Sequence, residues 1–250
     1  MSLSSTIEPY ARRSSQELRL AVAPRLLIGC IGDNFQPGVW KSIKAAEEHT
    51  RQAGGAVATL VLGNLCIVSH MGLEAMRNML IMKACDGGFD YLALVEDDCL
   101  LTDPSIFVSL VKRKVDIVAP HFDQSRLLPA DSGKVFSLAD PLYKAGQGLR
   151  EVQWTVRSCV LFDCDVFAKL GERPFIDTPI YAAEEYHGLW FKRRGVTWWQ
   201  DTDISATLLR PPIPPWEIEF GKVRFPFDSG GTDIDELMTL HREFRKEGRS

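Results

Sequence analysis

The sequence lacks any long hydrophobic run. No apolar stretch reaches the roughly 18 to 20 residues that a membrane-spanning helix needs. The N-terminal residues are polar and do not contain the apolar segment of a signal peptide. We therefore expect a cytoplasmic protein without a transmembrane segment.

Paired cysteines and a strong basic charge are missing as well. The 6 cysteines are scattered without metal-site spacing, and several fall in strand-like apolar runs. This pattern favours reduced, buried thiols. The formal net charge of -4 gives no general attraction to nucleic acid or anionic membranes. Short basic clusters do occur, at 112–114, 192–194 and 242–249.

The first half of the sequence alternates strand-like and helix-like segments. Apolar runs predict the strands, and apolar residues at helical spacing predict the helices between them. The predicted strands are 25–31, 57–62, 91–95 and 115–119, and the predicted helices are 39–52, 72–85 and 104–113. This order predicts an α/β fold with a mostly parallel central sheet and helices on both faces.

The second half of the sequence is less regular. It predicts a polar loop at 123–150, a strand at 152–162, helices at 165–170 and 182–194, and a strand at 196–199 followed by a polar segment. We predict one domain over residues 25–209. A polar arm at 1–24 precedes it, and 210–250 contains a Pro-rich segment and a C-terminal helix.

The chain is organised around an acidic turn that directly follows the predicted strand at 91–95. Glu96, Asp97 and Asp98 are consecutive there. Their carboxylates repel one another unless a cation lies among them, and hard oxygen ligands suit Mg²⁺ or Mn²⁺. The alternative is a solvated acidic turn that only precedes the next helix. Ligands of open α/β sheets bind at the carboxyl ends of strands, where Asp33 is also expected.

Several short motifs follow one another in a recognisable order. Arg77 and Asn78 lie in a predicted helix, and Glu96-Asp97-Asp98 follows the next strand. Later motifs are Asp116 to Pro120, Val166 to Gly171, Ala183-Glu184-Glu185 and Arg193 to Gly195. Over residues 25–205 this order resembles the A-fold nucleotide-sugar glycosyltransferases, in particular the family 2-like group.

The resemblance implies a role for the acidic triplet. In that family it binds the metal that holds the nucleotide diphosphate. Asp98 is therefore expected to coordinate the cation directly. Glu96 and Asp97 are expected at the nucleotide, with Glu96 acting on the ribose or through water. Glu96 stands where the family more often has aspartate.

The resemblance also assigns residues to the nucleotide. Arg77 and Asn78 match an Arg-Asn pair that faces the nucleotide or its phosphates, and a guanidinium suits phosphate geometry. Asp33 is expected to contact the base or ribose. The alternatives are an ordinary arginine on a helix surface and a structural aspartate in a turn.

Glu184 and Glu185 match the family's acidic pair at the start of a late helix. One carboxylate of that pair serves as general base for the acceptor hydroxyl, so both glutamates are catalytic candidates. Glu185 occupies the position that the family usually fills with aspartate. As an alternative, two acids in a first helical turn complement the helix macrodipole without catalysis.

The resemblance leaves one metal ligand to be found. Family members often carry a late histidine that binds the cation, and this chain has Leu208 and Leu209 near that position. Asp203 is the candidate replacement. Asp201, or a water molecule that completes the coordination of Mg²⁺, is the alternative.

The resemblance thus implies a metal-dependent hexosyltransferase that uses Mn²⁺ or Mg²⁺ and a nucleotide-sugar donor, with UDP as the expected nucleotide. The acceptor hydroxyl can belong to a glycan, a lipid-linked sugar, a metabolite, a protein or a hydroxylated DNA base. Two other functions stay open. A nucleotidyltransferase expects a glycine-rich phosphate loop after the first strand, which residues 32–34 match poorly. A non-catalytic sugar-nucleotide-binding protein would tolerate the substituted glutamates.

Overall fold

The computed structural model describes residues 24–32, 35–63, 73–123, 139–140, 143–171, 173–175 and 183–209. The strands are β1 (Arg25–Ile31), β2 (Ala56–Leu62), β3 (Tyr91–Glu96), β4 (Cys99–Leu101), β5 (Ile117–Asp123), β6 (Ala139–Asp140), β7 (Leu149–Val152), β8 (Trp154–Thr155), β9 (Cys159–Asp163) and β10 (Trp198–Leu208). The helices are α1 (Pro37–Gln52), α3 (Leu73–Asp86), α4 (Ile106–Val111), the 3-10 helix η2 (Cys164–Val166), α5 (Phe167–Leu170) and α6 (Ala183–Arg193).

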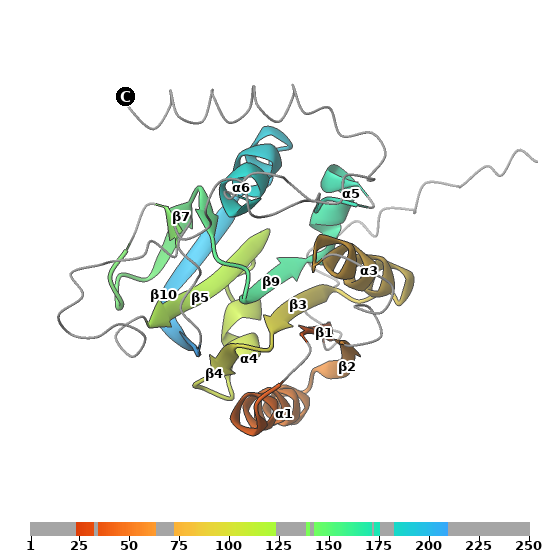
Figure 1. Ribbon diagram of the computed structural model, residues 1–250, viewed down its shortest axis with the longest axis vertical. Coiled ribbons are helices and arrows are strands. Elements are labelled where there is room, and N and C mark those ends of the chain that lie inside the picture. The colour runs from red at the N-terminus through yellow and green to blue at the C-terminus, as the bar shows by residue number, and fades with distance from the viewer. Residues whose placement is uncertain are drawn as a thin grey trace, which may run out of the picture.

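An 8-stranded mixed sheet forms the centre of the molecule (Figure 1). Its strand order is β2-β1-β3-β9-β5-β10-β4, and β7 also pairs with β10. β2, β1, β3, β5 and β10 run in one direction, whereas β9, β4 and β7 run in the other. This confirms the predicted α/β fold with a mostly parallel sheet. The antiparallel position of β9 between β3 and β5 was not predicted.

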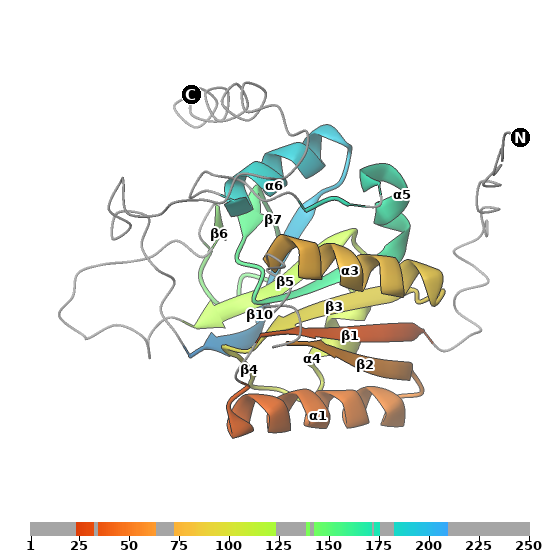
Figure 2. The same ribbon diagram turned by 45° about the vertical axis from the view of Figure 1, so that its right-hand side comes forward.

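Helices cover the sheet on both faces. Figure 2 shows α1 and α4 on one side and α3, α5 and α6 on the other. As predicted for a strand covered on both faces, β3 is buried from Leu92 to Val95. Gly29 of β1 allows α3 to pack closely, because a Cβ there would lie 2.7 Å from a methyl carbon of Leu80.

The last strand is longer than predicted. The sequence indicates a short strand followed by a polar segment, but β10 continues to Leu208, with a register shift in its pairing with β5 between Asp201 and Ser205. Gln200, Asp201 and Thr202 are buried in it. Asp201 pairs with Arg113, and the Thr202 hydroxyl donates to the carbonyl of Gly148 at 2.8 Å. The polarity of Asp201 and Thr202 does not end the strand, because the fold supplies partners for these two side chains.

The predicted strand at 152–162 is in fact divided. The structure separates it into the end of β7, the short β8, and β9. Arg157 and Ser158 lie in the break between β8 and β9 and are both buried. Polar groups at this depth need polar partners, and these two find them in α3, α6 and the end of β3. The break between β8 and β9 therefore places Arg157 and Ser158 next to their polar partners in the interior.

Some predictions fall outside the described residues. These are the structure of the arm at 1–23, the Pro-rich segment and helix at 210–250, and the position of Asp33. Within the part of the chain that the structure describes, no helix is long and apolar enough to cross a membrane. The described portion of 25–209 contributes to one continuous hydrophobic core.

Candidate active site

The acidic turn lies where the carboxyl ends of three strands meet. β1 and β3 are parallel, and Ile31 lies opposite Glu96 in their register. The backbone N–H of Asp97 donates to the Ile31 carbonyl at 3.0 Å. The N–H of Leu209, which directly follows β10, donates to the Asp98 carbonyl at 2.8 Å. The structure thus fixes the backbone of the turn from both sides.

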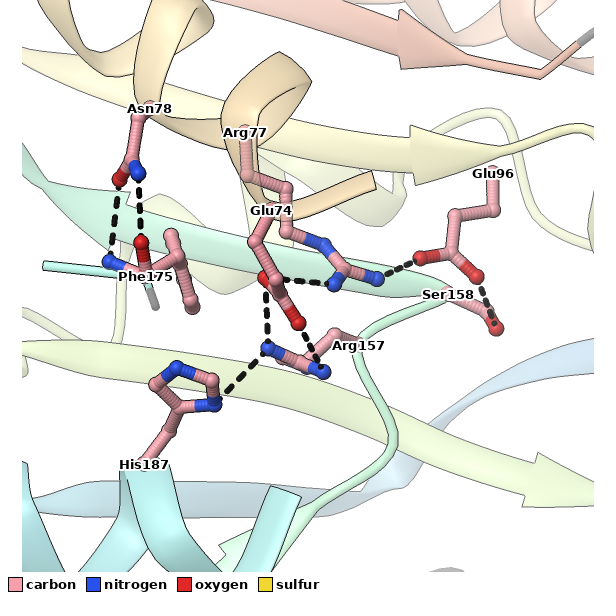
Figure 3. Close-up of polar contacts among 8 residues, drawn as sticks. All are labelled: Glu74, Arg77, Asn78, Glu96, Arg157, Ser158, Phe175 and His187. Atoms are coloured by element: carbon pink, nitrogen blue, oxygen red, sulfur yellow. Dashed lines mark hydrogen bonds and ion pairs between the residues drawn. The ribbon is translucent and has the colours of Figure 1, made fainter. Parts of the chain in front are cut away.

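Glu96 is held by side chains behind the turn (Figure 3). One carboxylate oxygen accepts from Arg77 of α3, and the other accepts from the Ser158 hydroxyl at 3.0 Å. The backbone N–H of Glu96 also donates to the Ser158 carbonyl, at 2.9 Å. Both oxygens of Glu96 are therefore engaged inside the protein. Asp97 and Asp98 are half-buried and provide the other two carboxylates of the turn.

Arg77 belongs to a chain of charged groups that extends into the core. Its Nη1 lies 2.9 Å from a Glu74 oxygen, and Glu74 also accepts from both terminal nitrogens of Arg157, at 2.8 and 3.1 Å. Arg157 Nη1 lies 3.1 Å from Nδ1 of His187 on α6. We call Glu96, Arg77, Glu74, Arg157 and His187 the buried charge chain (Figure 3). It connects α3, the acidic turn, the β8–β9 break and α6.

Glu74 is the electrostatic centre of the buried charge chain. Burial by itself would raise the pKa of its carboxyl group, but the guanidinium groups of Arg157 and Arg77 outweigh that effect and lower the pKa to about 2. Glu74 is consequently ionised at neutral pH. Two buried cations with one shared carboxylate would carry an excess positive charge, and Glu96 neutralises it at the end next to the turn.

The low pKa of Glu74 predicts an acid-sensitive contribution to stability. Because the folded-state pKa lies below the ordinary value of 4.5, the contribution is complete above that value and is lost as the pH falls toward about 2. We expect the difference in unfolding free energy between the parent and Glu74→Gln to shrink over this range. Urea denaturation at several pH values measures it. A difference that does not change with pH would contradict the prediction.

Asn78 is also engaged inside the protein. Its side-chain nitrogen donates to the Phe175 carbonyl at 2.5 Å, and its side-chain oxygen accepts from the Phe175 N–H at 3.0 Å. The Phe175 ring then lies near the guanidinium groups of Arg77 and Arg157, with centroid distances of 5.9 and 5.4 Å. Arg77 and Asn78 thus lie beside the acidic turn, and their side chains bind Glu96 and Phe175 within the protein.

Asp97 faces the end of β1. A Cβ placed on Gly32 would lie 2.3 Å from Cγ of Asp97, so only glycine leaves room for this carboxylate. Gly32 also has a φ of +146°, which favours glycine. Asp33, the predicted nucleotide contact, follows directly in sequence but lies outside the described residues.

The structure does not bring Asp203 to the acidic turn. Asp203 lies 3.7 Å from Arg113, and its carboxylate accepts from the Gly148 N–H at 3.2 Å. In β10 it precedes Leu208, which is paired with Cys99, by about 15 Å of extended strand. Leu208 thus pairs with the residue that follows Asp98, whereas the Asp203 carboxylate contacts Arg113 and Gly148.

The catalytic candidates lie on α6. Glu184 and Glu185 are in its first turn, and the structure describes their backbone but not their side chains. His187 follows on the same helix and is completely buried. Next to it, a Cβ on Gly188 would lie 2.1 Å from the Gln153 carbonyl oxygen. α6 therefore packs tightly against the segment before β8.

A divalent cation at the acidic turn would be bound by carboxylates of the protein together with groups of the substrate. Among the described residues, no group of three His, Cys, Asp or Glu is arranged to hold a metal. Mg²⁺ at nucleotide sites is commonly bound by one or two carboxylates together with phosphates and water. The acidic turn also carries negative charge. The pKa of the adjacent Cys99 thiol is raised by its hydrogen bond to Cys159, by burial, and by the charges of Asp98 and Glu96.

Glu74, Arg157, Ser158 and His187 were not predicted from the sequence as parts of the site. Two signals were present. Glu74 precedes Arg77 by one helical turn, a spacing at which opposite charges meet. Arg157 is the one charged residue in the strand-like run at 152–162, and a charged residue at such a position needs a buried partner. The partners themselves, Glu74 and His187, are distant in sequence.

Comparison with known proteins identifies the fold. No protein-family model and no curated protein matches this sequence. A structure of GalNAc-T7 with UDP, GalNAc and Mn²⁺ covers 90% of this chain and 50% of its own, at 9% identity and a TM-score of 0.51. A197 from STIV covers 73% of this chain and 84% of its own, at 13% identity and a TM-score of 0.43. The chain has the glycosyltransferase A-type fold, as its motifs predicted.

Proposed function

We propose that the protein is a glycosyltransferase that moves a hexose from a UDP-sugar to an acceptor hydroxyl with the help of Mn²⁺ or Mg²⁺. The observation that carries this proposal is the acidic turn. Asp97 and Asp98 lie at the carboxyl edge of an A-type sheet, while Glu96 is fixed behind them by Arg77 and Ser158. The similar GalNAc-T7 structure contains UDP and Mn²⁺, which supports the choice of donor and cation.

The residues of the acidic turn have different roles in donor binding. Asp98 holds the cation, and Asp97, beside Gly32, lies next to the nucleotide. When bound, the cation neutralises the charge that develops on the departing diphosphate. Because Glu96 is held on two sides, the turn needs little reorganisation when the donor binds.

Transfer then needs a base at the acceptor. The bond between the anomeric carbon and the diphosphate oxygen breaks, and its electron pair leaves with UDP. A bond forms from the acceptor oxygen to the anomeric carbon, and the hydroxyl proton passes to Glu185 or Glu184. Both lie in the first turn of α6. A base positioned within hydrogen-bond reach contributes about 10²- to 10⁴-fold to such a step.

Nucleotide binding provides the direct test of the proposal. We expect UDP and UDP-sugars to raise the melting temperature only when Mn²⁺ or Mg²⁺ is present, more than GDP-, CMP- or dTDP-sugars do. A ligand at 100 times its dissociation constant stabilises the folded state by about 2.7 kcal/mol, which a thermal-shift assay detects. If no nucleotide shifts the melting temperature, the proposal is wrong. Binding without UDP release from any UDP-sugar would indicate a non-catalytic sugar-nucleotide-binding protein.

Gly32 offers a test of the position of Asp97. In Gly32→Ala the new methyl group would collide with Asp97, so we expect weaker UDP binding as well as a stability loss of about 1 to 3 kcal/mol from the strained backbone. Gly54→Ala is the matched control, because Gly54 has a φ of +92° and nothing within 4 Å of the place that a Cβ would occupy. It should lose stability but bind UDP normally. Calorimetric titration with UDP and Mn²⁺ separates the two results, and equal UDP affinity in both variants would remove Asp97 from the site.

A further inference from the structure

The buried charge chain fixes the protonation of His187. Arg157 Nη1 lies 3.1 Å from His187 Nδ1 and also 3.1 Å from Glu74 Oε2. A guanidinium group only donates hydrogen bonds, so Nδ1 must accept. The geometry therefore assigns the proton of the neutral ring to Nε2. With a neutral His187, the two glutamates and two arginines of the chain balance in charge.

The imidazole ring is held in place by its neighbours. It is completely buried, and its centroid lies 5.2 Å from that of Phe175. Phe175 is itself fixed through Asn78. Together with the tight contact at Gly188, this gives α6 one defined position along its axis.

The first turn of α6 is thereby connected to the acidic turn. Residues 183–186 immediately precede His187 in the helix. From His187 the contacts continue through Arg157, Glu74 and Arg77 to Glu96 without a break (Figure 3). All the links except Glu96 are nearly inaccessible to solvent. Buried charged partners have strict geometric requirements, because a displaced group loses its compensation.

We propose that His187 is a positioning residue that, through Arg157 and Glu74, sets the first turn of α6 relative to the acidic turn. The inference rests on the proposed function, because the acid pair in that turn is the candidate base. His187 touches no reacting atom. It acts by keeping Glu184 and Glu185 at the correct distance from a donor bound at Asp98.

Three variants distinguish positioning from simple packing. His187→Leu removes the acceptor and keeps an apolar side chain, whereas His187→Asn keeps an oxygen acceptor near the position of Nδ1. Phe191→Leu is the matched control. Phe191 is one turn later on α6, is completely buried and contacts Phe175 as His187 does, but its ring has no hydrogen-bonding atom.

The kinetic readout is UDP release from the UDP-sugar that binds best, with Mn²⁺ present. In His187→Leu we expect kcat to fall about 10²-fold while KM for the donor stays near the parent value, because a misplacement of about 1 Å costs that much. His187→Asn should recover most of kcat. Phe191→Leu should lower the melting temperature but leave kcat of the folded protein unchanged. Equal kcat losses in both leucine variants, or no recovery in His187→Asn, would overturn the inference.

Amide hydrogen exchange tests the same inference without a donor. The backbone N–H groups of residues 187–190 donate to the carbonyls of 183–186 in an α-helix. We expect them to exchange faster in His187→Leu than in the parent, His187→Asn or Phe191→Leu. Unchanged exchange in His187→Leu would overturn the inference whether or not UDP binds. Faster exchange in a protein that binds no nucleotide would leave the positioning role intact and reject only the proposed function.

Discussion

Asp98→Asn should abolish the metal-dependent stabilisation by UDP and reduce the rate of sugar transfer by about 10²- to 10³-fold. This is the usual rate loss when one group that stabilises the charge of the transition state is removed. Asparagine keeps the size of the side chain and removes its charge, so the backbone bond from Leu209 to residue 98 can persist. The melting temperature without ligand should therefore change little. Thermal shift with UDP and Mn²⁺ measures the loss, and a parent-like shift would exclude Asp98 as the ligand.

Two further variants show where the charge is needed. Asp203→Asn removes an equivalent charge beside Arg113, remote from the turn, and should leave UDP binding unchanged. If UDP binding instead falls as in Asp98→Asn, then Asp203 is a ligand and the cation does not lie at the acidic turn alone.

Glu185→Gln should retain UDP binding but lower transfer by about 10²- to 10⁴-fold. A parent-like transfer rate would leave Glu184 as the candidate base.

The centre of this protein could be predicted from sequence because its signal is local. An apolar run that ends in three acids specifies both a buried strand and a polar turn, and β3 with its turn lies where the run predicts. The segments at 39–52 and 72–85, which were predicted as helices, likewise form α1 and α3. Such elements depend on neighbours within one or two turns of the chain, which a single sequence displays.

The partners of polar residues could not be predicted, because they come from distant parts of the chain. Arg77 and Asn78 carry a motif that predicts nucleotide contacts, and their partners within the protein include Glu96 and Phe175, which lies 97 residues beyond Asn78. Asp201 extends β10 because Arg113, 88 residues away, meets it. A polar side chain in a sequence predicts a turn or a surface unless its partner is known.

The position of Asp203 illustrates the same limit. Leu209, near which the motif order predicts a metal ligand, donates its backbone N–H to the Asp98 carbonyl in the acidic turn. Asp203 was the candidate replacement, with Asp201 or water as the alternative. In a strand, however, five residues correspond to about 15 Å, so closeness in sequence along β10 is not closeness in space.

Glu74→Gln should destabilise the folded protein more than Gly32→Ala does. Glu74 compensates two guanidinium groups that are almost fully buried, with exposed fractions of 2% for Arg77 and 3% for Arg157. Glutamine removes the charge and leaves Arg157 with the neutral His187 as its remaining partner in the buried charge chain. Breaking a buried ion pair on one side typically costs about 3 to 5 kcal/mol, and urea denaturation at neutral pH measures it.

The controls for this prediction lie elsewhere in the same chain. Glu48→Gln makes the same chemical change in α1 at an exposed pair with Arg51, and should cost less than about 1 kcal/mol. The double variant Glu74→Gln with Arg157→Met should lose less stability than the two single losses together, because the second change removes the cation that the first leaves without its carboxylate. Strict additivity, or a loss in Glu74→Gln as small as that in Glu48→Gln, would mean that the buried charge chain does not act as one unit.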